Sequence, residues 1–206
     1  SGNAWSFEPN TAEFQPPSWS THTNSGNNPC INEFLAKNTA VNSDTFGDFD
    51  DWIEILNRNN IVIDLGGMFL SDDPTNLTKW TFPAGTNLHP GGTVLIWCDE
   101  ESSQGPLHAN FKLSGSGERL FLVDVDGSTI LDAITYGSQE DDIATGRLFD
   151  GGEQWATLRT PTPDSSNEQA SGYREYDQLD PLGSGLRLEG GGIPSNGGSV
   201  NLKVTG

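Results

Sequence analysis

Short apolar runs separated by turn residues are the feature that most constrains what this chain can fold into. The runs are rich in β-branched and aromatic residues, and Gly, Asn, Asp and Pro lie between them. No window of helical length carries an apolar stripe at the helical period. The sequence therefore predicts an all-β domain. The predicted strands are residues 30–35, 52–57, 61–65, 68–70, 79–82, 93–98, 119–123 and 129–134.

Two features of these runs predict more than strand formation. Residues 93–98 are apolar without alternation, as in a central strand that is covered on both faces. Asp126 and Gly127 separate residues 119–123 from residues 129–134, and this dipeptide is a strong signal for a tight turn between antiparallel strands. We therefore expect a hairpin around Asp126-Gly127.

The composition and the apolar pattern divide the chain into three parts. Residues 30–167 hold the predicted strands and form the expected β-sandwich. Residues 1–29 are polar, with Trp5 and Trp19 among their four large aromatic residues. That segment is either an arm that docks onto the sandwich or a linker from an upstream domain. The number of aromatic residues favours a docked arm.

Residues 168–206 form the third part, which is polar before two alternating stretches at residues 185–189 and 199–204. Such stretches are typical of the strands of a hairpin. Because a lone hairpin is marginal in water, this one either belongs to a further β domain or adds strands to the sandwich.

The order of motifs along residues 30–167 resembles that of the bacterial lamin-tail domain family. Each motif is weak alone, and together they cover about two-thirds of the chain. The chain departs from the family at Met68, where an aromatic residue is frequent, and at Asp164, where Gly is usual. The matching motifs are Ile31-Asn32-Glu33, residues 47–57, Asp64-Leu65-Gly66-Gly67, residues 70–73, Lys79-Trp80-Thr81-Phe82-Pro83, residues 108–113, residues 117–120, Asp132, Tyr136-Gly137, Gly146-Arg147, Asp150-Gly151, Trp155, residues 160–163 and Asn167.

This resemblance implies an immunoglobulin-like β-sandwich. It also implies a function, since the family consists mostly of accessory modules without chemistry of their own, attached to surface proteins or hydrolases. The expectation is therefore a non-catalytic structural or interaction module of a larger secreted or cell-surface protein, which contacts a protein partner or assembles with other copies.

The charge of the chain argues against two classes of partner. Asp and Glu number 29 against 10 Lys and Arg, for a formal net charge of −19. Nucleic-acid binding depends on cationic side chains, so we expect no nucleic-acid partner. No apolar run is long enough to span a bilayer, and anionic membrane surfaces would repel the chain, so we expect no membrane insertion. The acidity suits solubility or the binding of multivalent cations.

The two cysteines, Cys30 and Cys98, each lie at the end of a predicted strand. Two cysteines permit one disulfide and do not form a cysteine-rich metal site. A Cys30–Cys98 disulfide is therefore predicted, and a buried thiol is the alternative. Composition favours an extracellular or cell-surface location, which cysteine usage alone leaves open.

Catalytic motifs are missing from the sequence. The histidines, His22, His89 and His108, form no zinc-binding pair, and no nucleophile elbow or phosphate-binding loop is present. Nothing nominates a base for Cys98. The sequence predicts that the chain is not an enzyme.

Calcium is the cofactor that the acidic residues favour. Asp44, Asp48, Asp50 and Asp51 lie close in sequence, with Gly47 for a tight bend. Ca²⁺ binds several carboxylate and carbonyl oxygens, although this loop does not match the EF-hand pattern. The simpler interpretation is a solvated acidic loop in which Asp51 makes turn hydrogen bonds.

Aromatic residues outside the strand motifs suggest an alternative function. Trp5, Trp19, Tyr173 and Tyr176 are candidates for contacts with a protein partner or a cell-surface glycan. Sugar rings stack on such side chains, so the alternative hypothesis is a calcium-dependent carbohydrate-binding module.

Overall fold

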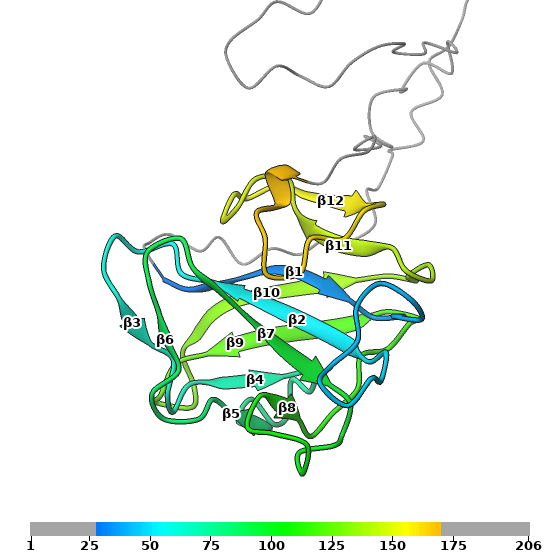
Figure 1. Ribbon diagram of the computed structural model, residues 1–206. Coiled ribbons are helices and arrows are strands. Elements are labelled where there is room, and N and C mark those ends of the chain that lie inside the picture. Colours follow the sequence, from blue (N-terminus) through cyan, green and yellow to red (C-terminus); the bar gives the residue numbers. More distant parts are fainter. Residues whose placement is uncertain (1–27, 170–206) are drawn as a thin grey trace, which may run out of the picture.

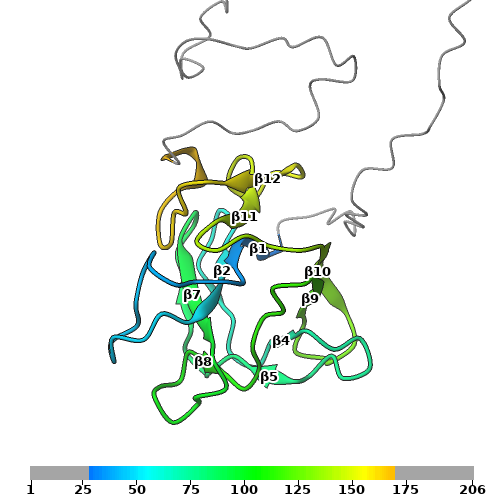
Figure 2. The same ribbon diagram turned by 90° about the vertical axis from the view of Figure 1, so that its right-hand side faces the viewer.

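The computed structural model describes residues 28–169, which form two facing β-sheets (Figures 1 and 2). This confirms the prediction of an all-β, immunoglobulin-like sandwich. The predictions for the N-terminal arm and the C-terminal hairpin fall on residues 1–27 and 170–206, outside the described residues.

The larger sheet has six strands in the order β12-β11-β1-β2-β7-β8. All its neighbours are antiparallel except β7 and β8, which run parallel. A bulge in β1 lies between Ile31 and Glu33. The bounds are β1 Cys30–Leu35, β2 Asp51–Leu56, β7 Thr93–Cys98, β8 His108–Ala109, β11 Ala144–Arg147 and β12 Trp155–Leu158.

The second sheet has four strands in the order β10-β9-β4-β5, and a small ribbon of β3 and β6 closes one end. The only helical element among residues 28–169 is the 3-10 helix η1 at Asn167–Gln169. The bounds are β3 Ile63–Asp64, β4 Phe69–Ser71, β5 Trp80–Thr81, β6 Asn87–Leu88, β9 Glu118–Val123 and β10 Ile130–Tyr136.

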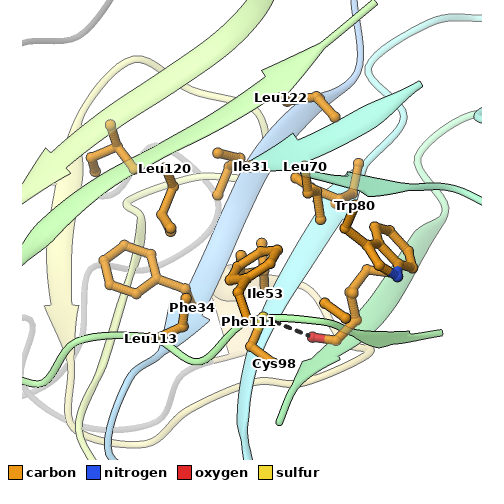
Figure 3. Packing of buried hydrophobic residues seen from close by; sticks show 14 of the residues in the cluster. Ile31, Phe34, Ile53, Leu70, Trp80, Cys98, Phe111, Leu113, Leu120 and Leu122 are labelled. Atoms are coloured by element: carbon orange, nitrogen blue, oxygen red, sulfur yellow. Dashed lines mark hydrogen bonds between the residues drawn. The ribbon is translucent and has the colours of Figure 1, made fainter. Parts of the chain in front are cut away.

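The core lies between the two sheets and is built from alternate residues of their strands (Figure 3). Phe34 of β1 is fully buried, with its ring centroid 4.5 Å from that of Tyr136 on β10 and 6.1 Å from that of Trp155 on β12. Ile53 and Ile96 point into the same layer from β2 and β7. The alternation that predicts a half-buried strand therefore produces this core.

The predicted hairpin at Asp126-Gly127 is present between β9 and β10. The backbone N–H of Asp124 donates to the carbonyl of Thr129 at 2.9 Å. Gly127 has a φ of 70°, in the left-handed region that glycine adopts without strain. The carboxylate of Asp126 accepts the N–H groups of Ser128 and Thr129 and completes the turn.

The prediction that residues 93–98 form a strand covered on both faces is wrong in part. The strand has the predicted bounds, but Leu95 and Trp97 on its outer face are only half-buried. They extend a second, smaller apolar cluster, whose buried members include Leu35 and Trp52. The outer residues of β7 are therefore apolar because this second cluster partly covers the outer face of the strand.

The predicted Cys30–Cys98 disulfide is not formed, and both thiols are free and buried. Cys30 pairs with Leu56 and Cys98 with Asp51, which are the two ends of β2. At about 3.3 Å per residue these ends are roughly 17 Å apart. A disulfide requires Cα atoms within about 7 Å. Both cysteines do lie at strand ends, but beside opposite ends of β2, so the predicted disulfide is wrong.

We expect both thiols to resist alkylation in the folded protein and to react after denaturation. Burial raises the pKa of Cys30 to about 12 and also raises the pKa of Cys98, so the reactive thiolate is scarce in each case. Intact mass after iodoacetamide treatment, with and without denaturant, measures this. A disulfide-bonded mass in the native sample would contradict the strand pairing that places Cys30 and Cys98 beside opposite ends of β2.

Candidate functional site

β12 is one of the two edge strands of the larger sheet and has a strand neighbour on one side only among residues 28–169. The N–H of Leu148 donates to the carbonyl of Gln154 at 2.7 Å, which makes this a hydrogen-bonded pair. Hydrogen-bonded pairs alternate with non-hydrogen-bonded pairs along antiparallel strands. The backbone N–H and C=O groups of Ala156 and Leu158 therefore also point toward β11. The N–H and C=O groups of Trp155 and Thr157 therefore point away from the sheet.

The exposed backbone of β12 lies on a rigid support. The guanidinium of Arg147 on β11 lies 4.7 Å from the ring of Trp155. Its Nε donates to the carbonyl of Ile31 at 2.7 Å, and Nη2 donates to Asp132 on β10 at 2.7 Å. A third donor, Nη1, bonds the carbonyl of Gly152. These contacts tie β11 and the β11–β12 turn to β1 in the same sheet and to β10 in the other sheet.

β10, an edge strand of the second sheet, contacts the same group of residues through Asp132. Besides its bond to Arg147, the carboxylate of Asp132 accepts the N–H of Ile31 on β1 at 2.9 Å. Asp132 is almost fully buried, so burial raises its pKa while Arg147 lowers it, with a net rise. Asp132 and Arg147 thus join the two sheets at this corner of the sandwich. β12 projects beyond this corner (Figure 1).

Residues 162–167 dock on the outer face of β1 and β2 through two buried carboxyl groups. Glu33 and Glu54 are cross-strand partners and have no exposed surface. Thr162 donates its N–H and its hydroxyl to Glu33 at 2.9 and 2.6 Å. The N–H of Asp164 donates to Glu54 at 2.8 Å. Burial raises the pKa of Glu33 to about 7 and that of Glu54 to about 8.

The amide of Asn167 anchors the end of this docked segment. Its Nδ2 donates to the carbonyls of Arg147 at 2.8 Å and of Asn32 at 3.2 Å. Asp164, the residue that departs from the family motif, has a φ of 57° in the left-handed region. Glycine adopts that conformation most easily and Asp tolerates it better than most residues. The geometry therefore explains why Gly is usual there.

Three of the four predicted calcium ligands lie together in the acidic loop, residues 44–50. Asp44, Asp48 and Asp50 each offer a carboxylate oxygen, and these oxygens lie within 4.8 Å of one another. Asp51 does not join them, because it is the first residue of β2 and its Oδ1 accepts the N–H of Asn38 at 3.3 Å. Burial raises the pKa of Asp51 to about 6.

The acidic loop lies beside the end of β7 and the start of β8. The ring of Phe46 contacts His108 edge-on, with centroids 6.4 Å apart. His108 is hydrogen-bonded to buried Asp99, and its ring stacks near that of Trp97. The contacts of His108 with Asp99, Trp97 and Phe46 therefore indicate a role in packing.

The aromatic residues proposed for partner or glycan contact are not placed. Trp5, Trp19, Tyr173 and Tyr176 lie outside the described residues. Sequence reasoning missed the edge at β12, because an edge strand is defined by the order of the strands in the sheet. Within the described part of the chain, no helix is long and apolar enough to cross a membrane.

Comparison with known proteins gives a family match. A family model described as Lamin Tail Domain matches residues 22–138. A comparison with curated proteins finds no match. The matched span ends before β11, and the larger sheet continues beyond it through β11 and β12.

Proposed function

This chain belongs to the lamin tail domain family, and on that basis we propose that it is a structural and interaction module of a larger secreted or cell-surface protein. Immunoglobulin-like domains of this family are generally non-catalytic. The module binds an extended segment of a partner protein by strand addition along β12. Its role is to position the larger protein at a surface or within an assembly.

The single observation that carries this proposal is that β12 has no strand partner on its outer side among residues 28–169. Trp155 and Thr157 direct their N–H and C=O groups outward, and strand addition uses such groups for affinity. Edge strands that avoid pairing often carry Lys or Pro, yet residues 155–158 contain neither. An extended peptide fits this edge without displacing any described strand.

The charge of the chain supports a partner protein over a second copy as the occupant. A net charge of −19 makes two copies repel each other and favours a segment with basic residues. Binding of such a segment weakens as salt concentration rises, because exposed charges are screened.

Replacing Thr157 with proline is expected to abolish partner binding and to leave stability almost unchanged. Proline removes only an N–H that points outward, and edge positions of this kind tolerate it. The matched control T157V keeps the N–H and retains binding. A156P removes a donor to β11 and lowers the melting temperature.

Pull-down from the native cell envelope, quantified for the wild type, T157P and T157V, measures the effect. A protein retained by the wild type and T157V but lost with T157P supports strand addition. Equal retention by all three proteins, with unchanged melting temperatures, would sink it. Light scattering of the purified chain distinguishes a self-associating edge from one that binds another protein.

The extracellular location is part of the proposal. It is supported by the acidic composition and by the resemblance to modules of bacterial secreted proteins. Fractionation of the native cells with an antibody against residues 28–169 tests it. Recovery only from the cytoplasmic fraction would contradict the location and leave strand addition on β12 to be tested separately.

Carbohydrate binding is the rival function, and the described residues that favour it are Phe46 and Phe49. Their side chains are 60% and 47% exposed, and both residues lie within the acidic loop. A glycan array with and without calcium is expected to stay silent. A reproducible signal lost in F46A or F49A would replace the interaction module with a carbohydrate-binding one.

A further inference from the structure

Two carboxylates of the acidic loop have buried oxygens that no protein group satisfies. Asp44 is only 8% exposed, and its Oδ1 accepts the N–H groups of Phe46 and Asp48 at 2.8 and 2.9 Å. Its Oδ2 is buried and has no hydrogen-bond partner, and the same holds for Oδ2 of Asp50. A buried carboxylate oxygen without a partner is costly, so both atoms require a ligand.

A third oxygen of this kind lies in the neighbouring loop, residues 99–107. Oε1 of Gln104 is buried without a partner, while its Nε2 bonds Glu101. These three are the only unsatisfied buried side-chain oxygens among residues 28–169, and the other unsatisfied atoms are nitrogens of Arg58 and Trp155. The unsatisfied buried atoms of these two loops are therefore all oxygens, which a cation or a hydrogen-bond donor can satisfy.

Among residues 28–169, no Lys, Arg or His forms an ion pair with the acidic loop. The ion pairs among residues 28–169 join Lys37 to Asp141, Lys79 to Asp72, His108 to Asp99 and Arg147 to Asp132. Four further acidic residues, Asp99, Asp48, Glu101 and Asp44, lie near enough to Asp50 to act on it electrostatically. The two loops thus concentrate negative charge at one corner of the sandwich.

We propose that Asp44, Asp48 and Asp50 form a Ca²⁺-binding site at this corner. Two oxygens on opposite sides of one Ca²⁺ are separated by about 4.6–5.2 Å, given a Ca–O distance of 2.3–2.6 Å. The three carboxylate oxygens lie within 4.8 Å of one another, so one ion reaches all of them. Backbone carbonyls and water complete the six to eight ligands that Ca²⁺ takes.

The chemistry of the donors selects the ion. All three side chains offer oxygen, whereas zinc and copper sites use imidazole or thiolate ligands. Mg²⁺ demands a near-ideal octahedron and keeps several waters, which suits one or two carboxylates better than three on a single loop. The ion would rigidify residues 44–50 and neutralise the repulsion among them. This site is independent of β12 and of the proposed function.

Thermal unfolding tests the site with calcium itself as the probe. The metal-stripped chain is compared in EDTA, in calcium and in magnesium, and isothermal titration calorimetry measures calcium binding directly. If the site has the affinity typical of extracellular modules, about 10 mM calcium raises the melting temperature by roughly 3–10 °C. Magnesium is expected to give less than half of that rise.

The variant D50N keeps the size of a half-buried ligand and removes its charge. Its melting temperature in EDTA equals or exceeds that of the wild type, which demonstrates folding, and its calcium-dependent rise is lost. The control E140Q removes one charge from an exposed residue outside the loop and keeps the full rise. No rise in the wild type, or an equal rise in D50N, would overturn the site.

Discussion

Replacing Arg147 with alanine is expected to lower the free energy of unfolding by about 3–5 kcal/mol, because it leaves a buried carboxylate unpaired. Arg147 is 4% exposed and bonds the carboxylate of Asp132. It also satisfies the carbonyl of Ile31 and covers the ring of Trp155. The substitution therefore removes the side-chain contacts that tie β11 to the backbone of β1 and to β10 of the other sheet.

Urea denaturation followed by tryptophan fluorescence measures this loss. The control R119A removes an exposed arginine, and its effect is expected to stay within about 0.5 kcal/mol. A cycle with D132N adds a second check, because the two residues act on each other and their effects are not additive. An R147A variant as stable as R119A would contradict the role of Arg147 in joining the sheets.

Stability is expected to fall as pH rises from about 5 to 8. Burial raises the pKa of Glu33 to about 7 and that of Glu54 to about 8, from an ordinary value of 4.5. The folded protein therefore holds these protons more tightly than the unfolded chain. In this window the unfolded chain loses the protons first, so each carboxyl lowers stability by up to about 1.4 kcal/mol per pH unit.

The variant E54Q separates this effect from the rest of the titration. Glutamine keeps an oxygen for the N–H of Asp164 or the amide of Asn32, yet it does not ionise. We expect a shallower fall of stability with pH in E54Q than in the wild type. E140Q, which changes an exposed carboxyl, keeps the wild-type slope. Parallel curves for E54Q and the wild type would show that Glu54 ionises normally.

The strands that the sequence predicts correctly are those whose apolar residues are contiguous or alternate. The run at residues 93–98 forms β7 with the predicted bounds, and residues 30–35 form β1. Residues 144–147 escaped prediction because Ala, Thr, Gly and Arg form no apolar pattern. Their burial comes from the Asp132–Arg147 pair and from Asn167, which are tertiary contacts.

Tertiary contacts also determine which features of the candidate sites the sequence predicts and which it misses. Local spacing brings Asp44, Asp48 and Asp50 together, because one loop holds all three. Spacing alone does not reveal that Asp51 has entered β2 and turned away. Glu33 and Glu54 look like solvent-facing positions of alternating strands, and only the docking of residues 162–167 buries them. Sheet order, which defines the free edge at β12, depends on pairings between distant segments.

Residue-resolved amide hydrogen exchange of the isolated chain shows whether the outer side of β12 is open to a partner, since exchange reports whether a backbone N–H is bonded. We expect fast exchange at Trp155 and Thr157, whose N–H groups point outward, and slow exchange at Ala156 and Leu158, whose N–H groups bond β11. Equal protection at all four positions would show that β12 is already covered and would contradict an edge available to a partner.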